Sequence, residues 1–536
     1  MNRRRVPHLV HDFLHLSADA RPDAPAVVHE SERRSYGDIE SASNRIARLL
    51  VRRGVRPGDR VGLLAQNSVL YVEAYYAILK AGGIVVSLNT AGDARTLQEL
   101  LRDCGASALI VGPRFGEVVG HALGGLPDLR ILLAGRGGVP EEVPAHVDSA
   151  GIEESDVEPG GSPPGVRRID LDCAAIVYTS GSTGKPRGAV LTHLNIAANT
   201  NSIVEYLELT EDDRVLVVLP FYYVYGKSLL NTHIRVGASI VIENRFLFPQ
   251  VAVDTLAREE ATGFSGVPST FAILLNRTNF ARRDLPRLRY VTQAGGPMAP
   301  ELIRRLVEAL PGRKVFIMYG ATEASARLSY LDPEALPGKI GSIGRPIPNV
   351  DLRVLRDDGS PAAPGEVGEI VARGSNIMEG YWADPVETEK VLDGSGFRTG
   401  DLGWADEDGF LFVAGRKRDM VKSGGHRIHP KEIEEALLEH PEVHEVAVIG
   451  IPDEVLGEAI KAFVVLRAGT RARETDLEEF CSRRLPAFKV PKVIEVRADL
   501  PKNPSGKILK EVLRTETCGA SATNEASRLD VLPGKS

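Results

Sequence analysis

The feature that most constrains the fold of this chain is a repeated exchange between helical and strand-like hydrophobic patterns. Ile39, Ile46 and Leu50 recur at helical spacing, and Gly54 follows them as a stop signal. The short apolar run RVGLLA (60–65) then suits a buried strand. A second helical stretch and a second strand-like run, IVVSL, come next. This alternation predicts an α/β protein with layered, largely parallel sheets.

Changes in composition divide the chain further. The segment 151–168 is rich in Gly, Pro and acidic residues, which is typical of a surface connection. Short β runs separated by Asp-Gly and Pro-Gly turns at 351–374 predict a small β subdomain. Pro430 then opens a helix in a stretch whose pattern fits a compact α+β domain. We expect a large N-terminal domain with two α/β layered sheets and a small β subdomain, a small mobile C-terminal domain, and a disordered tail, at 1–416, 417–515 and 516–536.

Composition excludes several classes of function. The chain has 536 residues and a formal net charge of −7, so no strongly basic field is present to attract nucleic acid. Its four cysteines are far apart, which argues against a disulfide framework or a structural zinc site. No run of about 18 apolar residues occurs, and the start is too polar for a signal peptide, so we expect no stable membrane insertion and a cytoplasmic location.

A stretch dense in glycines and hydroxyls follows a strand-like run and predicts a phosphate-binding loop. It spans 179–188 and contains four hydroxyls, one lysine and three glycines. It is not a Walker A loop, because Pro186 follows Lys185 and Thr179 stands where the first glycine would be. A solvated loop is the alternative reading, and the position at the end of a buried strand favours a ligand site.

The loop and four later motifs together resemble the adenylate-forming superfamily, in its acyl-CoA synthetase branch. The motifs follow in that family's order: YTSGSTGKPRG, YGATE, FRTGD, GRKRDMVKSGGHRIHPKEIE and PKNPSGKI. The resemblance covers nearly the whole chain except its tail. It implies that a carboxylate attacks the α-phosphorus of ATP and expels pyrophosphate, and that CoA then displaces AMP from the acyl-adenylate.

The resemblance assigns the nucleotide site to residues of the first three motifs and one further glycine segment. Tyr319 would stack on adenine with Gly320 beside it, Thr322 would bond the α-phosphate, and Glu323 would hold Mg²⁺, for which Thr179 is a second candidate. The loop residues would hold the β- and γ-phosphates: Thr179, Ser180, Gly181, Ser182, Thr183, Gly184 and Lys185. The segment beside adenine would be Gly295, Gly296 and Pro297, for which a plain turn is the alternative.

The ribose and the moving catalytic groups would come from later in the chain. Asp401 would accept bonds from both ribose hydroxyls, and Arg416 would support the sugar or the phosphate. Lys507 would bridge the carboxylate and the α-phosphate while negative charge develops there. After a rotation about the hinge Arg418, which is Asp or Lys in most of the family, the CoA step would use Lys422, Gly424 and Gly425.

The segment 219–233 departs from the family where an acid pocket is expected. Tyr223 replaces a histidine that many acyl-CoA synthetases carry, and Lys227, Asn231 and His233 are unusual polar company. They could line a pocket for a polar or aromatic acid, or face solvent or another helix. Ser265 and Gly266 are expected to supply another wall.

We therefore expect an AMP-forming acid–CoA ligase that uses ATP, Mg²⁺ and CoA on a small-molecule acid, as a monomer or homodimer. One alternative acceptor is the phosphopantetheine of a carrier protein acting in trans, and another is an amine. A further alternative is adenylation of a non-carboxylate oxyanion such as nitrite. A nucleotide-binding protein without catalysis is disfavoured because Lys507, Glu323 and Asp401 are all present.

Overall fold

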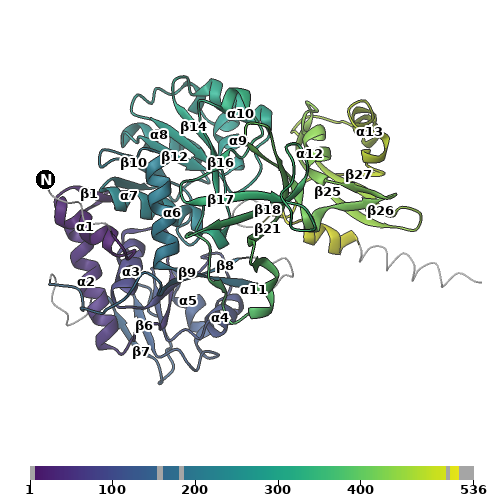
Figure 1. Ribbon diagram of the computed structural model, residues 1–536. Coiled ribbons are helices and arrows are strands. Elements are labelled where there is room, and N and C mark those ends of the chain that lie inside the picture. Colours follow the sequence, from purple (N-terminus) through teal and green to yellow (C-terminus); the bar gives the residue numbers. More distant parts are fainter. Residues whose placement is uncertain (1–6, 154–160, 180–185, 503–507, 518–536) are drawn as a thin grey trace, which may run out of the picture. The chain divides into compact units, whose positions relative to one another are not determined.

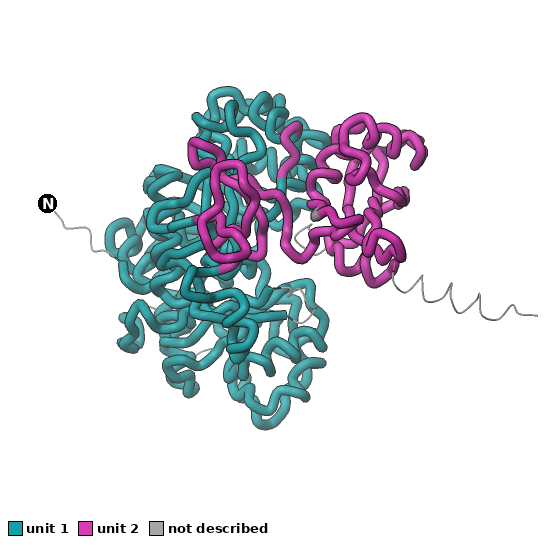
Figure 2. Tube along the Cα trace, turned by 45° about the vertical axis from the view of Figure 1, so that its right-hand side comes forward, with its two compact units in different colours: residues 1–297, 302–352, 372–397 teal, residues 298–301, 353–371, 398–536 magenta. Residues whose placement is uncertain are grey.

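The computed structural model describes four stretches of the chain, residues 7–153, 161–179, 186–502 and 508–517 (Figure 1). All counts of strands below refer to these stretches. The chain forms two compact units, drawn in teal and magenta in Figure 2. The first contains residues 1–297, 302–352 and 372–397, and the second contains 298–301, 353–371 and 398–536.

A nine-stranded sheet forms one half of the first unit. Its neighbours run in the order β16, β15, β14, β13, β12, β10, β11, β1, β2. The strands from β14 through β1 pair in parallel, so their carboxyl ends share one edge. Their bounds are, in that order: Arg345–Pro346, Ser329–Leu331, Lys314–Tyr319, Tyr290–Gln293, Gly263–Gly266, Arg214–Val217, Ser239–Ile242, Pro25–His29 and Glu32–Ser35.

An eight-stranded sheet forms the other half of the first unit. Its order is β19, β9, β8, β4, β3, β5, β6, β7, and strands β8 to β7 pair in parallel. The antiparallel strands β9 and β19 extend it beyond β8. The bounds, in that order, are Gly380–Tyr381, Arg187–Thr192, Cys173–Thr179, Ile84–Ser87, Arg60–Leu64, Ala108–Val111, Ile131–Ala134 and Asp148–Gly151.

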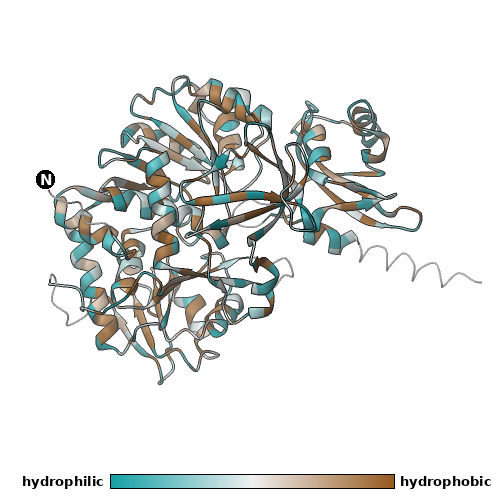
Figure 3. Ribbon diagram, in the orientation of Figure 1, coloured by the Kyte–Doolittle hydropathy of each residue, from teal (hydrophilic) through white to brown (hydrophobic). Residues whose placement is uncertain are grey.

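Amphipathic helices cover these sheets. Helix α2 (Tyr36–Arg52) buries the predicted stripe of Ile39, Ile46 and Leu50, and it begins with a capping box in which Ser35 and Asp38 bond each other's backbone. In Figure 3, α2 alternates between hydrophobic and hydrophilic bands. Three other helices are important for the site: α3 (Val69–Lys80), α6 (His193–Tyr206) and α7 (Val224–Val236).

The second unit holds much of a small sheet and all of a separate α+β fold. The small sheet runs β17, β18, β21, β20, with β22 on β21, and its bounds are Val350–Leu355, Gly368–Gly374, Gly396–Ala405, Leu392–Asp393 and Leu411–Arg416. The α+β fold has the order β24, β23, β26, β25, with β27 on β26. Its elements are β23 (Val421–Ser423), β24 (His426–Ile428), α12 (Pro430–Leu438), β25 (Val443–Asp453), β26 (Gly457–Leu466), α13 (Glu474–Ser482) and β27 (Val493–Arg497).

These elements confirm the predicted fold class of two layered α/β sheets, a small β subdomain and an α+β C-terminal region. The predicted connection at 151–168 begins with Gly151, the last residue of β7, and its other described residues form no helix or strand. The described residues 510–517 are helical, so the first two residues assigned to the tail belong to this helix. The remainder of the predicted tail, 518–536, lies outside the described residues.

Candidate active site

The carboxyl edge of the nine-stranded sheet brings together residues predicted to bind adenine and the acid. Gly266 ends β12, Tyr319 ends β14, and the Gly295–Gly296 pair follows β13 between them. The side chain of Gln293 donates to the carbonyl oxygen of Gly296 at 2.9 Å, and Gly295 has a φ of 86°, which glycine adopts without strain. Ligands of parallel α/β sheets gather at this edge.

The predicted magnesium ligand is held by a residue that sequence reasoning missed. Glu323 lies in the short 3-10 turn Thr322–Ala324, and the hydroxyl of Tyr381 donates to its Oε1 at 2.8 Å. Burial, then the neighbouring Glu323 carboxylate, raises the pKa of Tyr381, so the phenol remains a donor. No local pattern marks Tyr381, because its position depends on strand β19 pairing with β9 about 190 residues away.

The predicted phosphate loop lies between two antiparallel strands of the eight-stranded sheet. Thr179 at the end of β8 is the register partner of Arg187 at the start of β9, and the Thr179 hydroxyl donates to the Arg187 carbonyl oxygen at 3.4 Å. Arg187 forms an ion pair with Glu387 at 2.8 Å and lies 5.7 Å from the centre of the Tyr381 ring. The loop's anchors and Glu323 therefore meet around Tyr381. The predicted residues Ser180, Gly181, Ser182, Thr183, Gly184 and Lys185 lie outside the described residues.

The two residues predicted to hold the ribose form a pair. Asp401 on β21 and Arg416 on β22 are register partners, and Arg416 Nε lies 3.0 Å from Asp401 Oδ1. Asp401 is buried, whereas the Arg416 side chain is about two-fifths exposed. An arginine bonded to a carboxylate fixes the direction in which the carboxylate oxygens point.

The residues predicted for the CoA step and the hinge belong to a surface turn region. Lys422 and both glycines are exposed, and Gly424 and Gly425 have φ values of 55° and 81° in the turn between β23 and β24. Arg418 is exposed in the 3-10 turn Lys417–Asp419 between β22 and β23. Lys507 lies outside the described residues.

The predicted pocket residues differ strongly in exposure. Ser265 is fully buried, with its hydroxyl 2.7 Å from that of Thr292, and Asn231 is 2% exposed between the hydroxyls of Tyr75 and Tyr76. His233 is likewise buried, and its Nε2 lies 3.0 Å from the Tyr290 hydroxyl, so it belongs to the core.

Two of the predicted pocket residues, Tyr223 and Lys227, lie at the start of helix α7 and are partly exposed. Tyr223 packs against Tyr222 with ring centres 4.6 Å apart. Tyr225 belongs to the same helix, and the centre of its ring lies 4.1 Å from the guanidinium carbon of Arg327. Arg327 is buried, and sequence reasoning also missed it. A tyrosine- and cation-rich segment thus occupies the region where the acid is expected.

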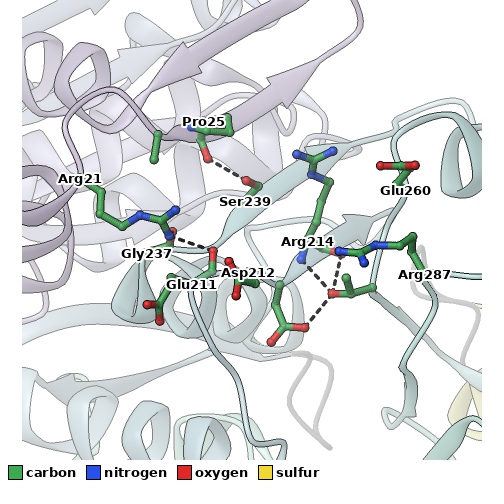
Figure 4. A pocket seen from close by; sticks show the side chains of 12 residues that line it. Arg21, Pro25, Glu211, Asp212, Arg214, Gly237, Ser239, Glu260 and Arg287 are labelled. Atoms are coloured by element: carbon green, nitrogen blue, oxygen red, sulfur yellow. Dashed lines mark hydrogen bonds between the residues drawn. The ribbon is translucent and has the colours of Figure 1, made fainter.

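A separate cavity of about 190 Å³ lies at the opposite edge of the nine-stranded sheet (Figure 4). Arg214, Ser239 and Thr262 stand at the amino ends of β10, β11 and β12, and Arg21 donates to backbone oxygens there. Its lining contains three arginines and four acidic residues, so its charge does not favour a carboxylate substrate. It is not the predicted site.

Two features are absent from the described residues. None of the helices in the described part of the chain is both long and apolar enough to cross a membrane. No group of three or more His, Cys, Asp or Glu side chains arranged to hold a metal was found among those residues.

Comparison with known proteins agrees with this geometry. The AMP-binding enzyme family matches residues 14–382, and the AMP-binding enzyme C-terminal domain matches 432–507. A feruloyl-CoA synthase from Amycolatopsis sp is 36% identical over 92% of this chain and 96% of its own length. A long-chain-fatty-acid–CoA ligase from Bacillus subtilis is 32% identical over 93% of each chain.

A solved structure extends the comparison to ligands. The o-succinylbenzoate coenzyme A synthetase from Bacillus subtilis, in complex with ATP and a magnesium ion, is 30% identical and superposes with a TM-score of 0.81 over 93% of this chain and 98% of that chain. The two family matches together cover most of this chain, in the order that the motifs predict. The chain therefore belongs to the AMP-binding enzyme family, as an AMP-forming acid–CoA ligase that uses ATP, Mg²⁺ and CoA.

Proposed function

We propose that the described site binds ATP with adenine at the edge formed by Gly295, Gly296 and Tyr319, and ribose on Asp401. The observation that carries this proposal is the group around Tyr381, where Glu323 and the anchors of the phosphate loop meet. Mg²⁺ held by Glu323 would neutralise charge on the phosphates of the leaving pyrophosphate. Thr322, adjacent to Glu323, would donate to the α-phosphate.

The two chemical steps need different residues in this proposal. Lys507 would place positive charge where the carboxylate oxygen attacks the α-phosphorus and the bond to pyrophosphate breaks. In the second step the CoA thiolate would attack the acyl carbon and release AMP, with Lys422, Gly424 and Gly425 along the path of the pantetheine arm. Rotation about Arg418 would exchange these two sets of residues, and the domain boundary would lie next to it, at 416/417.

The identity of the acid is the finer part of the proposal. The relatives named above act on acids that differ from one another, so their names do not identify the acid of this chain. The partly exposed Tyr223 and Lys227 favour an acid with a polar or aromatic body over an unbranched fatty acid. We further propose that free CoA is the acceptor and that the enzyme works in the cytoplasm, where its three described, unpaired cysteines would stay reduced.

A panel of acids tests this function directly. Purified enzyme with ATP and Mg²⁺ is given fatty, aromatic and hydroxylated acids, and nitrite as a separate arm, while pyrophosphate and AMP are measured. CoA is then added, or a phosphopantetheinylated carrier protein, and the thioester is identified by mass spectrometry. We expect acid-dependent AMP and a CoA thioester. Release of ADP and orthophosphate in place of AMP and pyrophosphate would contradict the proposal, and size-exclusion chromatography separates monomer from homodimer.

A further inference from the structure

Lys227 occupies an unusual position for a lysine side chain. It lies in the first turn of helix α7, and its ammonium donates to the hydroxyls of Tyr71 at 2.6 Å and Ser87 at 2.7 Å. The ring centres of Tyr75 and Tyr71 lie 4.3 and 4.9 Å from its Nζ, which is cation–π distance. Helix α3 and the carboxyl end of β4 therefore surround this ammonium with aromatic faces and neutral hydroxyls.

The described residues around Lys227 supply no negative charge. Within the described stretches, no carboxylate lies within ion-pair distance of its Nζ. A second buried lysine, Lys80, shows the usual arrangement, with Glu40 at 2.6 Å and further bonds to Ser43 and Asn44. A buried charge without a counter-charge is costly, so such groups are normally paired. Burial accordingly lowers the pKa of the Lys227 ammonium well below its usual range.

The residue as a whole nevertheless stays partly exposed. Tyr71 and Ser87 are buried, whereas Lys227 is only partly buried. Its two bonds leave one of its three donors unused by those hydroxyls. Tyr223 lies one helical turn earlier on the same face of α7 and is also partly exposed.

Helix α7 also connects this cation to the nucleotide edge. Tyr225, two residues before Lys227, bonds Thr292 of strand β13 at 2.9 Å, and β13 leads into the Gly295–Gly296 turn. Tyr225 and Lys227 face different sides of the helix, so a ligand that starts at this turn would have to pass the amino end of α7, beside Tyr223, to reach Lys227.

We propose that Lys227 determines specificity by binding a second anionic group, of the carboxylate class, on the acid that this enzyme activates. The inference rests on the proposed function, in which the first carboxylate is adenylated. The hydroxyls of Tyr71 and Ser87 are neutral and leave the positive charge of the ammonium without a counter-charge. The second anion would supply that counter-charge and accept the remaining hydrogen bond of the ammonium. The two ends of the substrate would then be distinguished, because only one can reach the α-phosphorus.

Matched pairs of acids test the inference on the unmodified enzyme. Butanoate is compared with succinate, hexanoate with adipate, octanoate with suberate, and benzoate with each benzenedicarboxylate, by the kcat/KM of pyrophosphate release. In at least one pair we expect the diacid to be favoured by about tenfold or more, the effect of one hydrogen bond to a charged group. If every monoacid is activated as well as its diacid, the inference is wrong while the ligase function stands. If no acid of any kind gives AMP, the proposed function itself fails.

Three variants locate the effect at this residue. Lys227→Met removes the charge and keeps the length, and it should shift the diacid-to-monoacid ratio at least about tenfold toward the monoacid, mainly through the KM of the diacid. Lys227→Arg should retain most of the preference. The matched control Lys314→Met, which removes an exposed lysine far from this helix in sequence, should leave the ratio unchanged. Should Lys227→Met fail to fold, Lys227→Gln carries the same comparison.

A purely structural role for Lys227 has a different signature. The Met variant would then lower the unfolding temperature and reduce activity with all acids in proportion. A diacid-to-monoacid ratio equal to that of the unmodified enzyme would therefore overturn the inference. Thermal shift supplies a readout that is independent of activity, because the favoured diacid should stabilise the unmodified protein more than Lys227→Met at the same concentration.

Discussion

At the scale of single residues, the contact between Tyr381 and Glu323 is the most consequential in the described site. A metal-binding carboxylate is useful only if its oxygens point where the metal will bind, and an outer donor fixes that direction. Tyr381 donates to Oε1 of Glu323 and does not bond the other carboxylate oxygen. The neighbouring Arg187 keeps Tyr381 in place through its ring.

Replacement of Tyr381 by Phe should therefore weaken the use of magnesium. We expect Tyr381→Phe to raise the Mg²⁺ concentration for half-maximal adenylation by about tenfold. This is the smallest loss of metal affinity that is usual when a residue bonded to a metal ligand is replaced. A magnesium titration at fixed ATP measures this, and removal of Mg²⁺ with EDTA should stop adenylation in both proteins. Tyr330→Phe, which removes a hydroxyl elsewhere in the chain, serves as the control. An unchanged titration curve in Tyr381→Phe would refute the positioning role.

A second residue prediction concerns Lys507. We expect Lys507→Ala to lower the rate of acid-dependent pyrophosphate release by about 10²–10³-fold, because one preorganised donor to the developing charge is lost. ATP binding, measured by calorimetry, should persist. The control is Lys492→Ala, which removes an exposed lysine of the same unit. Adenylation at the normal rate in Lys507→Ala would show that another cation performs this role.

At the scale of elements, helix α6 is tied to the start of the chain by a histidine that must stay neutral. His193, its first residue, accepts the backbone N–H of Val10 on Nδ1 at 3.1 Å. That contact requires an unprotonated nitrogen. Burial, and then the nearby His11, lowers the pKa of His193 to about 3, and burial lowers that of His11 to about 4.

This arrangement predicts a loss of stability in mild acid. An unfolded histidine titrates near 6.5, so below that pH the unfolded chain binds protons that the folded chain refuses, and stability falls as the pH drops from about 6.5 toward 3. We expect the unfolding temperature to decline over this range and His193→Asn, which keeps an acceptor but cannot titrate, to decline less steeply. Thermal unfolding at a series of pH values measures this. The exposed His15→Asn is the control, and an equal slope in His193→Asn would disprove the assignment.

The elements also show how far the sequence alone reaches. The stripe of α2 and the strands around it could be predicted, because both follow from local periodicity. The partners of Glu323 and Lys227 could not, because they depend on pairings between distant segments, such as Tyr381 beside β9 and Tyr71 beside α7. Sequence patterns indicated the polar character of Asn231 and His233 but not that both are buried in the core.

At the scale of the whole molecule, the proposed mechanism separates the two half-reactions between different residues. Asp401 and Arg416 form one pair, and Lys422 with its glycine turn lies on a separate exposed hairpin. A mechanism that exchanges these sets by rotation predicts that mutations affect one step at a time.

Lys422→Ala tests this separation. We expect the variant to form acyl-adenylate at close to the normal rate and to transfer it to CoA at least about tenfold more slowly, as for loss of a charged contact. Single-turnover experiments measure the steps separately, with pyrophosphate release for the first and thioester formation for the second. Lys492→Ala should alter neither step. Equal losses in both steps would argue against the exchange of residues.

The place of strand β1 in the nine-stranded sheet affects how the protein is made. Its inner neighbour β11 comes about 210 residues later in the chain. At roughly 5–20 residues per second, a ribosome needs on the order of 10–40 s to deliver that partner. Throughout this interval the nascent polypeptide exposes an unpaired strand edge, the kind of surface that invites aggregation. During synthesis of this enzyme, strand β1 is therefore a binding segment for holdase chaperones.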